Sequence, residues 1–366
     1  MKRILYCSMR DRYMRNKSYG VVNKIETQKK CFENAGCKVF LRSPKGGNIV
    51  LPGGRRISNG KWDKISLPKQ IDFMYLRFDA ADRSFVRLLK KYKKENPKGK
   101  VLLEIPTYPF KDQYVKGSGF LFYLQSICAI RCARRYLDRI VLVSAPEKSV
   151  FGKRTLHINN GVDYDNVKVR TVNCSDGAIH IACVSTFAKW HGYDRLIEGL
   201  KIYNEEAHDK KVVLHMVGDG EERSYLQEVT KKYGIEESVV FHGVLKGEEL
   251  NHIYDLCDVA ADCFGCHRVN IQSVSSLKSK EYGAKGIPIV TSVRLDIYNN
   301  ETKKYICEFP QNDDPIEINR VVEFYNDVYE KKTKQQACDE IRDVFKKACS
   351  IETNFKNVID YITKGE

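Results

Sequence analysis

The sequence predicts an α/β protein with two doubly wound domains, each built on a parallel sheet covered by helices. Three observations lead to this prediction. The chain has 366 residues, which is enough for two hydrophobic cores. Short apolar strands alternate with helical patterns along both halves. The halves also differ in charge: residues 1–170 carry 37 Lys and Arg against 14 Asp and Glu (+23), and residues 171–366 carry 25 against 33 (−8).

In the first half, apolar runs predict strands, and apolar residues three or four apart predict helices. Val22, Ile25 and Phe32 share the face of a helix that Gly36 ends. In chain order we expect a strand at 3–8, this helix up to residue 35, strands at 38–41 and 71–76, a basic helix at 84–95, and strands at 101–105 and 140–144.

The second half repeats this alternation and then ends in about 50 residues of helical pattern. We expect strands at 179–184, 212–217, 239–241, 259–262 and 287–291, with helices at 193–203, 247–257 and 277–284. A polar stretch at 163–177 is the expected linker. We therefore place an N-terminal domain at 1–165, a C-terminal domain at 166–345, and a final helix at 346–366 that packs back toward the first domain. Ligands of such domains bind at the carboxyl ends of the strands.

The net charge of +23 predicts an anionic partner: a nucleic acid, phospholipid headgroups or a phosphorylated substrate. No RNA- or DNA-binding signature accompanies these charges, so a nucleic acid is not the expected partner. No run approaches the ~18 apolar residues of a membrane span. Thirteen scattered cysteines fit a reducing compartment, and we expect a cytoplasmic protein.

Two segments after predicted strands contain groups suited to phosphates. Lys189, His191 and Gly192 stand at the start of a helix, where a cation and free N–H groups suit a diphosphate. A surface loop with a solvated lysine is the alternative. Gly218-Asp219-Gly220 follows the next strand, and taken alone it reads as an ordinary strand-to-helix turn.

Two further segments follow later strands. Val244 comes after Phe241-His242-Gly243, where backbone groups are placed to contact a nucleobase. Lys278 and Glu281 lie in one predicted helix, where Lys278 suits a phosphate and Glu281 suits two vicinal ribose hydroxyls, because a carboxylate accepts both O–H groups. A surface ion pair between these two residues is the alternative.

In this order and spacing, the four segments resemble the retaining GT-B glycosyltransferases of family four, in particular bacterial enzymes of capsule, O-antigen and exopolysaccharide assembly. The Lys-Trp-His-Gly-Tyr-Asp-Arg, Gly-Asp-Gly and Leu-Lys-x-x-Glu-Tyr segments have the same layout. In the first half, 19–25 resembles the glycine-bearing first loop of the family, and 104–109 resembles the segment that borders its cleft. Residues 157–163 resemble the strand end that leads into its linker.

The resemblance implies two Rossmann-like domains facing a cleft, and transfer of a hexose-type sugar from a nucleotide-diphosphate sugar to a glycan or lipid-linked glycan, with retention and without metal or cofactor. It implies catalytic roles for Lys189, Lys278 and Glu281, and it places Glu104, Thr107 and Tyr108 on the acceptor side. The implied donor contacts are Gly20, Val21, His191, Gly218, Val244, His267, Arg268, Ser276 and Leu277.

One position departs from the family pattern. The wider family carries Glu-x7-Glu, and the position of the first Glu holds Ser273, with His267 and Arg268 nearby. A non-catalytic partner subunit of a glycosyltransferase complex therefore remains an alternative, and a nucleic-acid-binding protein is a less favoured one.

Three other patterns have simpler explanations. Asp163-Tyr-Asp165 could be taken for a metal-binding Asp-x-Asp, but after Asn-Gly a turn is favoured. A single Cys263-x-x-Cys266 pair is a weak zinc signal. The aromatic helix at 119–130, followed by Arg131, is either a core helix or an element that lies on the inner face of the plasma membrane.

Overall fold

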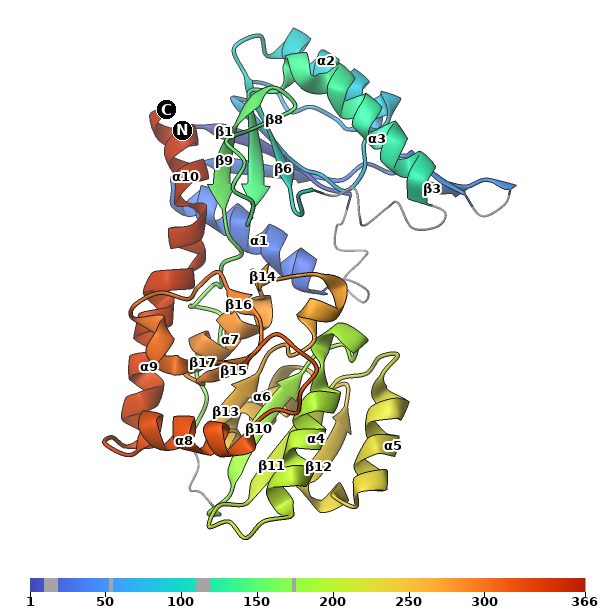
Figure 1. The fold of residues 1–366 in the computed structure, drawn as a ribbon. Coiled ribbons are helices and arrows are strands. Elements are labelled where there is room, and N and C mark those ends of the chain that lie inside the picture. The colour runs from blue at the N-terminus through green and yellow to red at the C-terminus, as the bar shows by residue number, and fades with distance from the viewer. Residues whose placement is uncertain (10–18, 53–54, 110–118, 173–175, 366) are drawn as a thin grey trace. The chain divides into compact units, whose positions relative to one another are not determined.

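In a computed structural model, which describes residues 1–9, 19–52, 55–109, 119–172 and 176–365, the chain forms two α/β units (Figure 1). The first unit comprises Met1–Asn159 and Asn354–Glu366, and the second comprises Asn160–Thr353. The division thus falls before residue 165, and most of the last helix is grouped with the first unit.

The first unit is built on a seven-stranded sheet with the order β2-β1-β5-β6-β7-β9-β8. All neighbouring strands are parallel except β8, which pairs antiparallel with β9. The strands are β1 (Arg3–Cys7), β2 (Lys38–Arg42), β5 (Phe73–Arg77), β6 (Lys100–Ile105), β7 (Arg139–Val143), β8 (Ser149–Val150) and β9 (Lys153–Ile158). A separate antiparallel hairpin joins β3 (Gly47–Val50) to β4 (Arg56–Asn59).

Successive residues of a strand point to opposite faces of the sheet, and here both sets are apolar. Helices therefore cover both faces. Tyr6 and Tyr75 face one side, where α1 (Tyr19–Asn34) contributes Phe32 and α10 (Ile351–Lys364) contributes Phe355. On the other side, Leu5 belongs to a core shared with α2 (Arg83–Glu95) and α3 (Phe120–Ala133). Both faces are therefore buried, as the continuous apolar strands require.

The second unit has a six-stranded parallel sheet with the order β12-β11-β10-β13-β15-β17. Its strands are β10 (Ile179–Val184), β11 (Val212–Val217), β12 (Val239–Gly243), β13 (Val259–Ala261), β15 (Ile289–Thr291) and β17 (Ile306–Glu308), and β14 (Ser273–Val274) pairs with β16 (Arg294–Leu295). Its helices are α4 (Tyr193–Asn204), α5 (Arg223–Tyr233), α6 (Gly247–Leu256), α7 (Leu277–Lys285), α8 (Ile318–Tyr329) and α9 (Lys334–Cys349). The prediction of two doubly wound parallel sheets is confirmed.

Three local predictions were wrong. In the first half, 140–144 was the last strand predicted from the sequence, but β9 follows it and continues the sheet in parallel. Helix α5 was not predicted, because Leu226 and Thr230 are its only fully buried side chains and give no clear apolar face. The expected linker belongs to the second unit over its described residues, where the buried Arg170 donates to the Cys257 carbonyl and, at 2.9 Å, to the Tyr329 hydroxyl.

A buried polar network crosses the first sheet at Glu104, whose side chain is 0% exposed. One carboxylate oxygen accepts hydrogen bonds from the Tyr75 hydroxyl at 2.5 Å and from the Gln28 amide at 2.8 Å. The other pairs with Arg77, and Lys24 lies 3.6 Å away. Burial alone would raise the pKa of Glu104, but Lys24 and Arg77 lower it to about 2.

A row of three histidines crosses the second sheet on adjacent strands. His180 Nδ1 lies 2.9 Å from His215 Nε2, and His215 Nδ1 lies 2.9 Å from His242 Nε2. At the other end, His180 Nε2 lies 3.2 Å from Asp176. Burial, with smaller effects of the neighbouring imidazoles, lowers the pKa of His215 to about 4, so this ring is neutral at pH 7.

We expect Glu104→Gln to lower the free energy of unfolding of the first unit by about 3–5 kcal/mol at pH 7, because it leaves the Arg77 charge buried and unpaired. The contribution of Glu104 is complete above the carboxyl pKa of the unfolded chain, about 4.3, and is lost as the pH falls toward the folded value of about 2. The difference between variant and wild type therefore shrinks in acid.

Urea unfolding followed by Trp62 fluorescence measures this loss. The chain has two tryptophans, and Trp62 is fully buried in the first unit, so a Trp190→Phe background isolates its signal. Glu95→Gln, an exposed acid of α2, is the matched control. Equal stability of the Glu104 and Glu95 variants at pH 7 would contradict the role given to the network.

Candidate functional site

The carboxyl ends of the second sheet bring together loops that lie far apart in the sequence. The amide of Gly218, after β11, donates to the Gly243 carbonyl at 2.7 Å, and the Phe264 amide, after β13, donates to the His191 carbonyl at 2.7 Å. Gly218 has φ of +134°, and a Cβ there would lie 1.8 Å from the Ser185 carbonyl oxygen. Only glycine allows this approach, which accounts for the Gly-Asp-Gly segment.

His191 and Lys189 lie after β10 in a short 3₁₀ turn, Lys189–His191. His191 is buried, and its Nδ1 accepts a hydrogen bond from the Ala188 amide at 3.2 Å, which places the ring proton on Nε2. Burial, together with the charge of Lys278, lowers the pKa of His191 to about 3. His191 is thus a neutral hydrogen-bond donor. Lys189 is exposed, and its ammonium has no ion-pair partner in the part of the chain that the structure describes.

A buried ion pair holds Lys278 in the first turn of α7. Its Nζ lies 3.1 Å from a carboxylate oxygen of Asp262, which follows β13 and is 0% exposed. Desolvation alone would lower the pKa of Lys278, but Tyr193 and Asp262 together raise it well above the usual value. The side chain keeps 24% of its surface exposed, so a permanent cation faces the carboxyl edge of the sheet.

Glu281 lies one turn beyond Lys278 on the same helix. Among the residues described, no hydrogen bond or ion pair involves its carboxylate, and burial raises its pKa against the opposing charge of Lys285. The alternative of a surface ion pair between Glu281 and Lys278 is therefore not observed, since Lys278 pairs with Asp262 instead. Ser276 caps α7 by accepting from the Ser279 amide at 3.4 Å, and Leu277 is 40% exposed.

Arg268 and His267 lie in the 3₁₀ turn Cys266–Val269, and both have acid partners. Arg268 forms a two-pronged pair with Asp194 at 2.8 and 2.9 Å and a further bond to Asp313 at 2.6 Å. His267 Nε2 lies 3.1 Å from the same Asp313 carboxylate. The sequence predicted Arg268 as a donor contact, and in the structure its guanidinium binds these two acids and holds the turn against α4.

The other predicted residues fall at strand ends or helix starts. Val244 follows β12 and is 60% exposed. In the first unit, Gly20 and Val21 lie in the first turn of α1, and Thr107 and Tyr108 follow β6. Glu104 was predicted on the acceptor side, but it is fully buried with both oxygens occupied by protein donors, so it orders the sheet.

The candidate metal patterns have structural explanations. Asp163 begins a turn, in which the Asn166 amide donates to its carbonyl at 3.1 Å. Cys263 and Cys266 are buried thiols. Within the described ranges, no group of three or more His, Cys, Asp or Glu side chains is arranged to hold a metal ion. Ser273, which replaces the first Glu of the family pattern, is exposed in the short strand β14.

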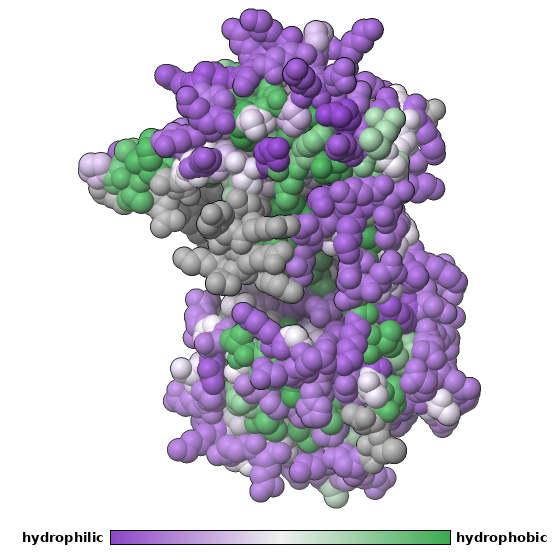
Figure 2. Space-filling model, turned by 180° about the vertical axis from the view of Figure 1, so that it is seen from behind, coloured by the Kyte–Doolittle hydropathy of each residue, from purple (hydrophilic) through white to green (hydrophobic). Residues whose placement is uncertain are grey.

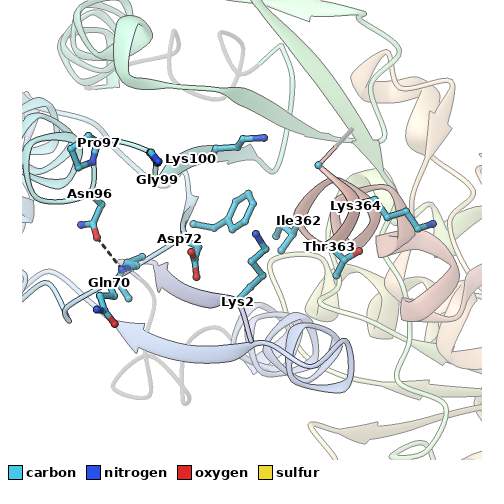
Figure 3. Close-up of a pocket in the computed structure, with 14 residues that line it drawn as sticks. Lys2, Gln70, Asp72, Asn96, Pro97, Gly99, Lys100, Ile362, Thr363 and Lys364 are labelled. Carbon is cyan, nitrogen blue, oxygen red and sulfur yellow. Dashed lines mark hydrogen bonds between the residues drawn. The ribbon is translucent and has the colours of Figure 1, made fainter.

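A separate cavity of about 650 Å³ lies in the first unit, at the edge of the sheet where its parallel strands begin (Figure 3). Lys2, Asp72, Phe73, Lys100 and Ile362 are among the residues that line it. None of the predicted site residues does, so this cavity is unrelated to the site described above.

Parts of this chain are similar in sequence to known proteins. Residues 170–315 match the model of the family described as glycosyl transferases group 1. A curated relative, an uncharacterized glycosyltransferase of Methanocaldococcus jannaschii, is 26% identical over 194 residues, which cover 48% of this chain and 47% of the relative. The chain therefore matches about half the length of that relative.

Solved structures of similar fold cover the whole chain. HepE of Anabaena in complex with UDP has a TM-score of 0.60 at 14% identity, with 100% of each chain covered. The lipopolysaccharide outer core galactosyltransferase WaaB has a TM-score of 0.56 at 14% identity, again with 100% of each chain covered. Among the described residues, no helix is long and apolar enough to cross a membrane. The two units thus have the GT-B fold of these glycosyltransferases, and the site in the second unit lies in the stretch that matches glycosyl transferases group 1.

Proposed function

We propose that this chain is a glycosyltransferase that moves a hexose-type sugar from a nucleotide-diphosphate sugar to a glycan or lipid-linked glycan, with retention and in cell-surface polysaccharide synthesis. Support comes from the family match over residues 170–315 and from the likeness in fold to HepE, whose structure contains UDP. The lipid-linked acceptor is supported by the likeness in fold to WaaB, a lipopolysaccharide galactosyltransferase.

The observation that carries the proposal is the carboxylate of Glu281, which has no hydrogen-bond or ion-pair partner among the described residues. The residue is half-buried and the pKa of its carboxyl is raised by burial, so its carboxylate gains when a ligand supplies the hydrogen bonds that the protein does not. Two vicinal hydroxyls of a ribose supply two O–H donors to one carboxylate. In this proposal the nucleoside therefore lies along α7, with its base near the backbone of Val244.

The diphosphate lies in the proposal near Lys189, Lys278 and the start of α7, whose first N–H groups and helix dipole favour an anion. In the reaction, the bond between the anomeric carbon and the diphosphate oxygen breaks, and a bond to the acceptor hydroxyl oxygen forms. The acceptor proton passes to an oxygen of the departing phosphate. The lysines stabilise the charge that develops there, and His191 Nε2–H is a neutral donor beside them.

A second candidate is a non-catalytic partner subunit, because Ser273 stands where the family carries its first carboxylate. Turnover of a nucleotide sugar by the purified chain separates the two. Such a subunit would bind the nucleotide without consuming the donor.

We expect Glu281→Gln to weaken nucleotide binding by about 1–3 kcal/mol, the cost of a charge-assisted hydrogen bond, while the fold persists. Calorimetric titration with UDP, GDP and dTDP measures the loss with the nucleotide that binds wild type. Glu237→Gln, an exposed acid of the same unit, is the control. Unchanged affinity in the Glu281 variant would remove the ribose assignment.

We expect Lys189→Ala to lower kcat more than it raises KM, since its attraction grows as charge develops on the diphosphate. Steady-state kinetics with the donor identified above measures both constants, and Lys211→Ala, an exposed lysine distant in sequence, is the control. Lys278→Ala should show the same split together with lower stability, because it leaves Asp262 buried and unpaired.

A change in KM alone would mean that the lysine holds only the ground state. Because Lys189 forms no ion pair with any residue that the structure describes, its removal leaves no such residue with an unpaired buried charge, and its variant keeps this test independent of folding.

A further inference from the structure

The β3–β4 hairpin and helix α3 of the first unit form one continuous surface. The Ser58 amide of β4 donates to the Gln125 side chain at 2.7 Å, and the Gln125 amide donates back to the Ser58 carbonyl at 2.9 Å. These paired bonds fix the hairpin beside the middle of α3. We call the exposed side chains of these two elements the hairpin–helix surface.

Apolar side chains are exposed on both elements of this surface. On the hairpin, Ile49 is 41% and Val50 is 64% exposed. On α3, Phe120 is 48% and Leu124 is 41% exposed. The outer end of the hairpin labelled in Figure 1 is hydrophobic in the space-filling view of Figure 2. Large exposed apolar side chains gathered on two adjoining elements indicate an interaction surface.

Helix α3 exposes only one of its faces. Phe122 is buried in the core, and Leu121 and Tyr123 are half-buried. Phe120 and Leu124 are one helical turn apart, and the exposed Cys128 and Arg131 continue the same stripe. The helix is therefore both a core element and an exposed one, with a different face for each.

The surface is also strongly basic, because its two segments contain no acidic residue. No Asp or Glu occurs between Glu33 and Asp63, or between Asp112 and Asp138. The exposed cations of these segments include Arg55 in the hairpin, Arg131 on α3, and three residues directly next to these elements in the chain: Lys45 before the hairpin, and Arg134 and Arg135 after α3. In the described ranges none of these five forms an ion pair, so their charge is available to a partner.

We propose that the hairpin–helix surface docks the protein on an anionic phospholipid bilayer. Unpaired arginines and lysines attract acidic headgroups, and the apolar side chains between them gain by entering the headgroup region. A nucleic acid would be attracted mainly by the charge, since three of the four exposed apolar side chains (Ile49, Val50 and Leu124) are aliphatic and only Phe120 offers a flat face for stacking a base. The proposal stands apart from sugar transfer, because it uses none of the site residues.

The experiment is flotation of the full chain with vesicles of phosphatidylcholine containing 30% phosphatidylglycerol, and with phosphatidylcholine vesicles as the neutral comparison. We expect wild type to float with the anionic vesicles at low salt and to be released when the salt is raised, because the Debye length shortens. Arg131→Glu/Arg134→Glu/Arg135→Glu should reduce the bound fraction about tenfold or more.

An apolar variant and two controls test whether vesicle binding depends on this surface. Ile49→Ser/Val50→Ser/Leu124→Ser should also bind less, whereas Ile202→Ser/Val240→Ser, at exposed positions of the second unit, should bind as wild type does. Lys331→Glu/Lys346→Glu/Lys347→Glu makes the same change of net charge on exposed positions of the second unit and should keep binding. Nucleotide affinity should be equal in all variants, which shows that the second unit folds in each. Urea unfolding followed by Trp62 fluorescence should match wild type in the variants of the first unit, which shows that this unit folds as well.

Three results would overturn the proposal. The first is no flotation of wild type with anionic vesicles at low salt. The second is equal loss of binding in the second-unit charge variant, which would mean that net charge alone acts. The third is a dimer of wild type that the apolar variant dissociates while flotation persists, which would mean that a second copy covers the surface. Loss of sugar transfer alone would leave vesicle binding unaffected, so the two proposals fail separately.

Discussion

The buried pair between Asp262 and Lys278 is the interaction on which the site in the second unit depends. Asp262 ends a central strand and is fully buried, so its charge requires a cation within a few ångströms. Lys278 supplies that cation from the first turn of α7. The pair therefore fixes the helix start against the sheet, and through the helix it fixes where Glu281 lies.

Burial disfavours the charged form of all three ionisable groups of this site, but the outcome differs among them. It disfavours the charged form of His191, which becomes a neutral donor, and it disfavours ionisation of Glu281. Lys278 stays charged only because Asp262 lies beside it. The same site thus holds a neutral hydrogen-bond donor, His191, and a permanent cation, Lys278. The difference between them is due to Asp262, which is itself fully buried.

Much of the fold was predictable because parallel strands covered on both faces are continuous apolar runs; all six residues of Val212–Val217 are buried. The site positions were predictable for a related reason, since loops after such strands meet at one edge. Pairings across long sequence distances were not. Arg268 reads as a free cation until Asp194 and Asp313 are seen beside it, 74 and 45 residues away. From the sequence, Asp262 is an ordinary strand end and Glu104 an acid on the acceptor side, because burial of a charge leaves no mark on the sequence around it.

The hydrogen bonds in the histidine row across the second sheet run in one direction, which is set by the contact between His180 and Asp176. A carboxylate can only accept, so Asp176 requires the proton of His180 to be on Nε2. When His180 is neutral, its Nδ1 accepts a hydrogen bond from the Nε2–H of His215, and Nδ1 of His215 in turn accepts one from the Nε2–H of His242. Every neutral ring in the row is thereby held in the same tautomer, and His242 is left with a bare lone pair on Nδ1 at the end of β12. The exposed acid Asp176 thus determines which nitrogen of His242, two strands away, can receive a proton.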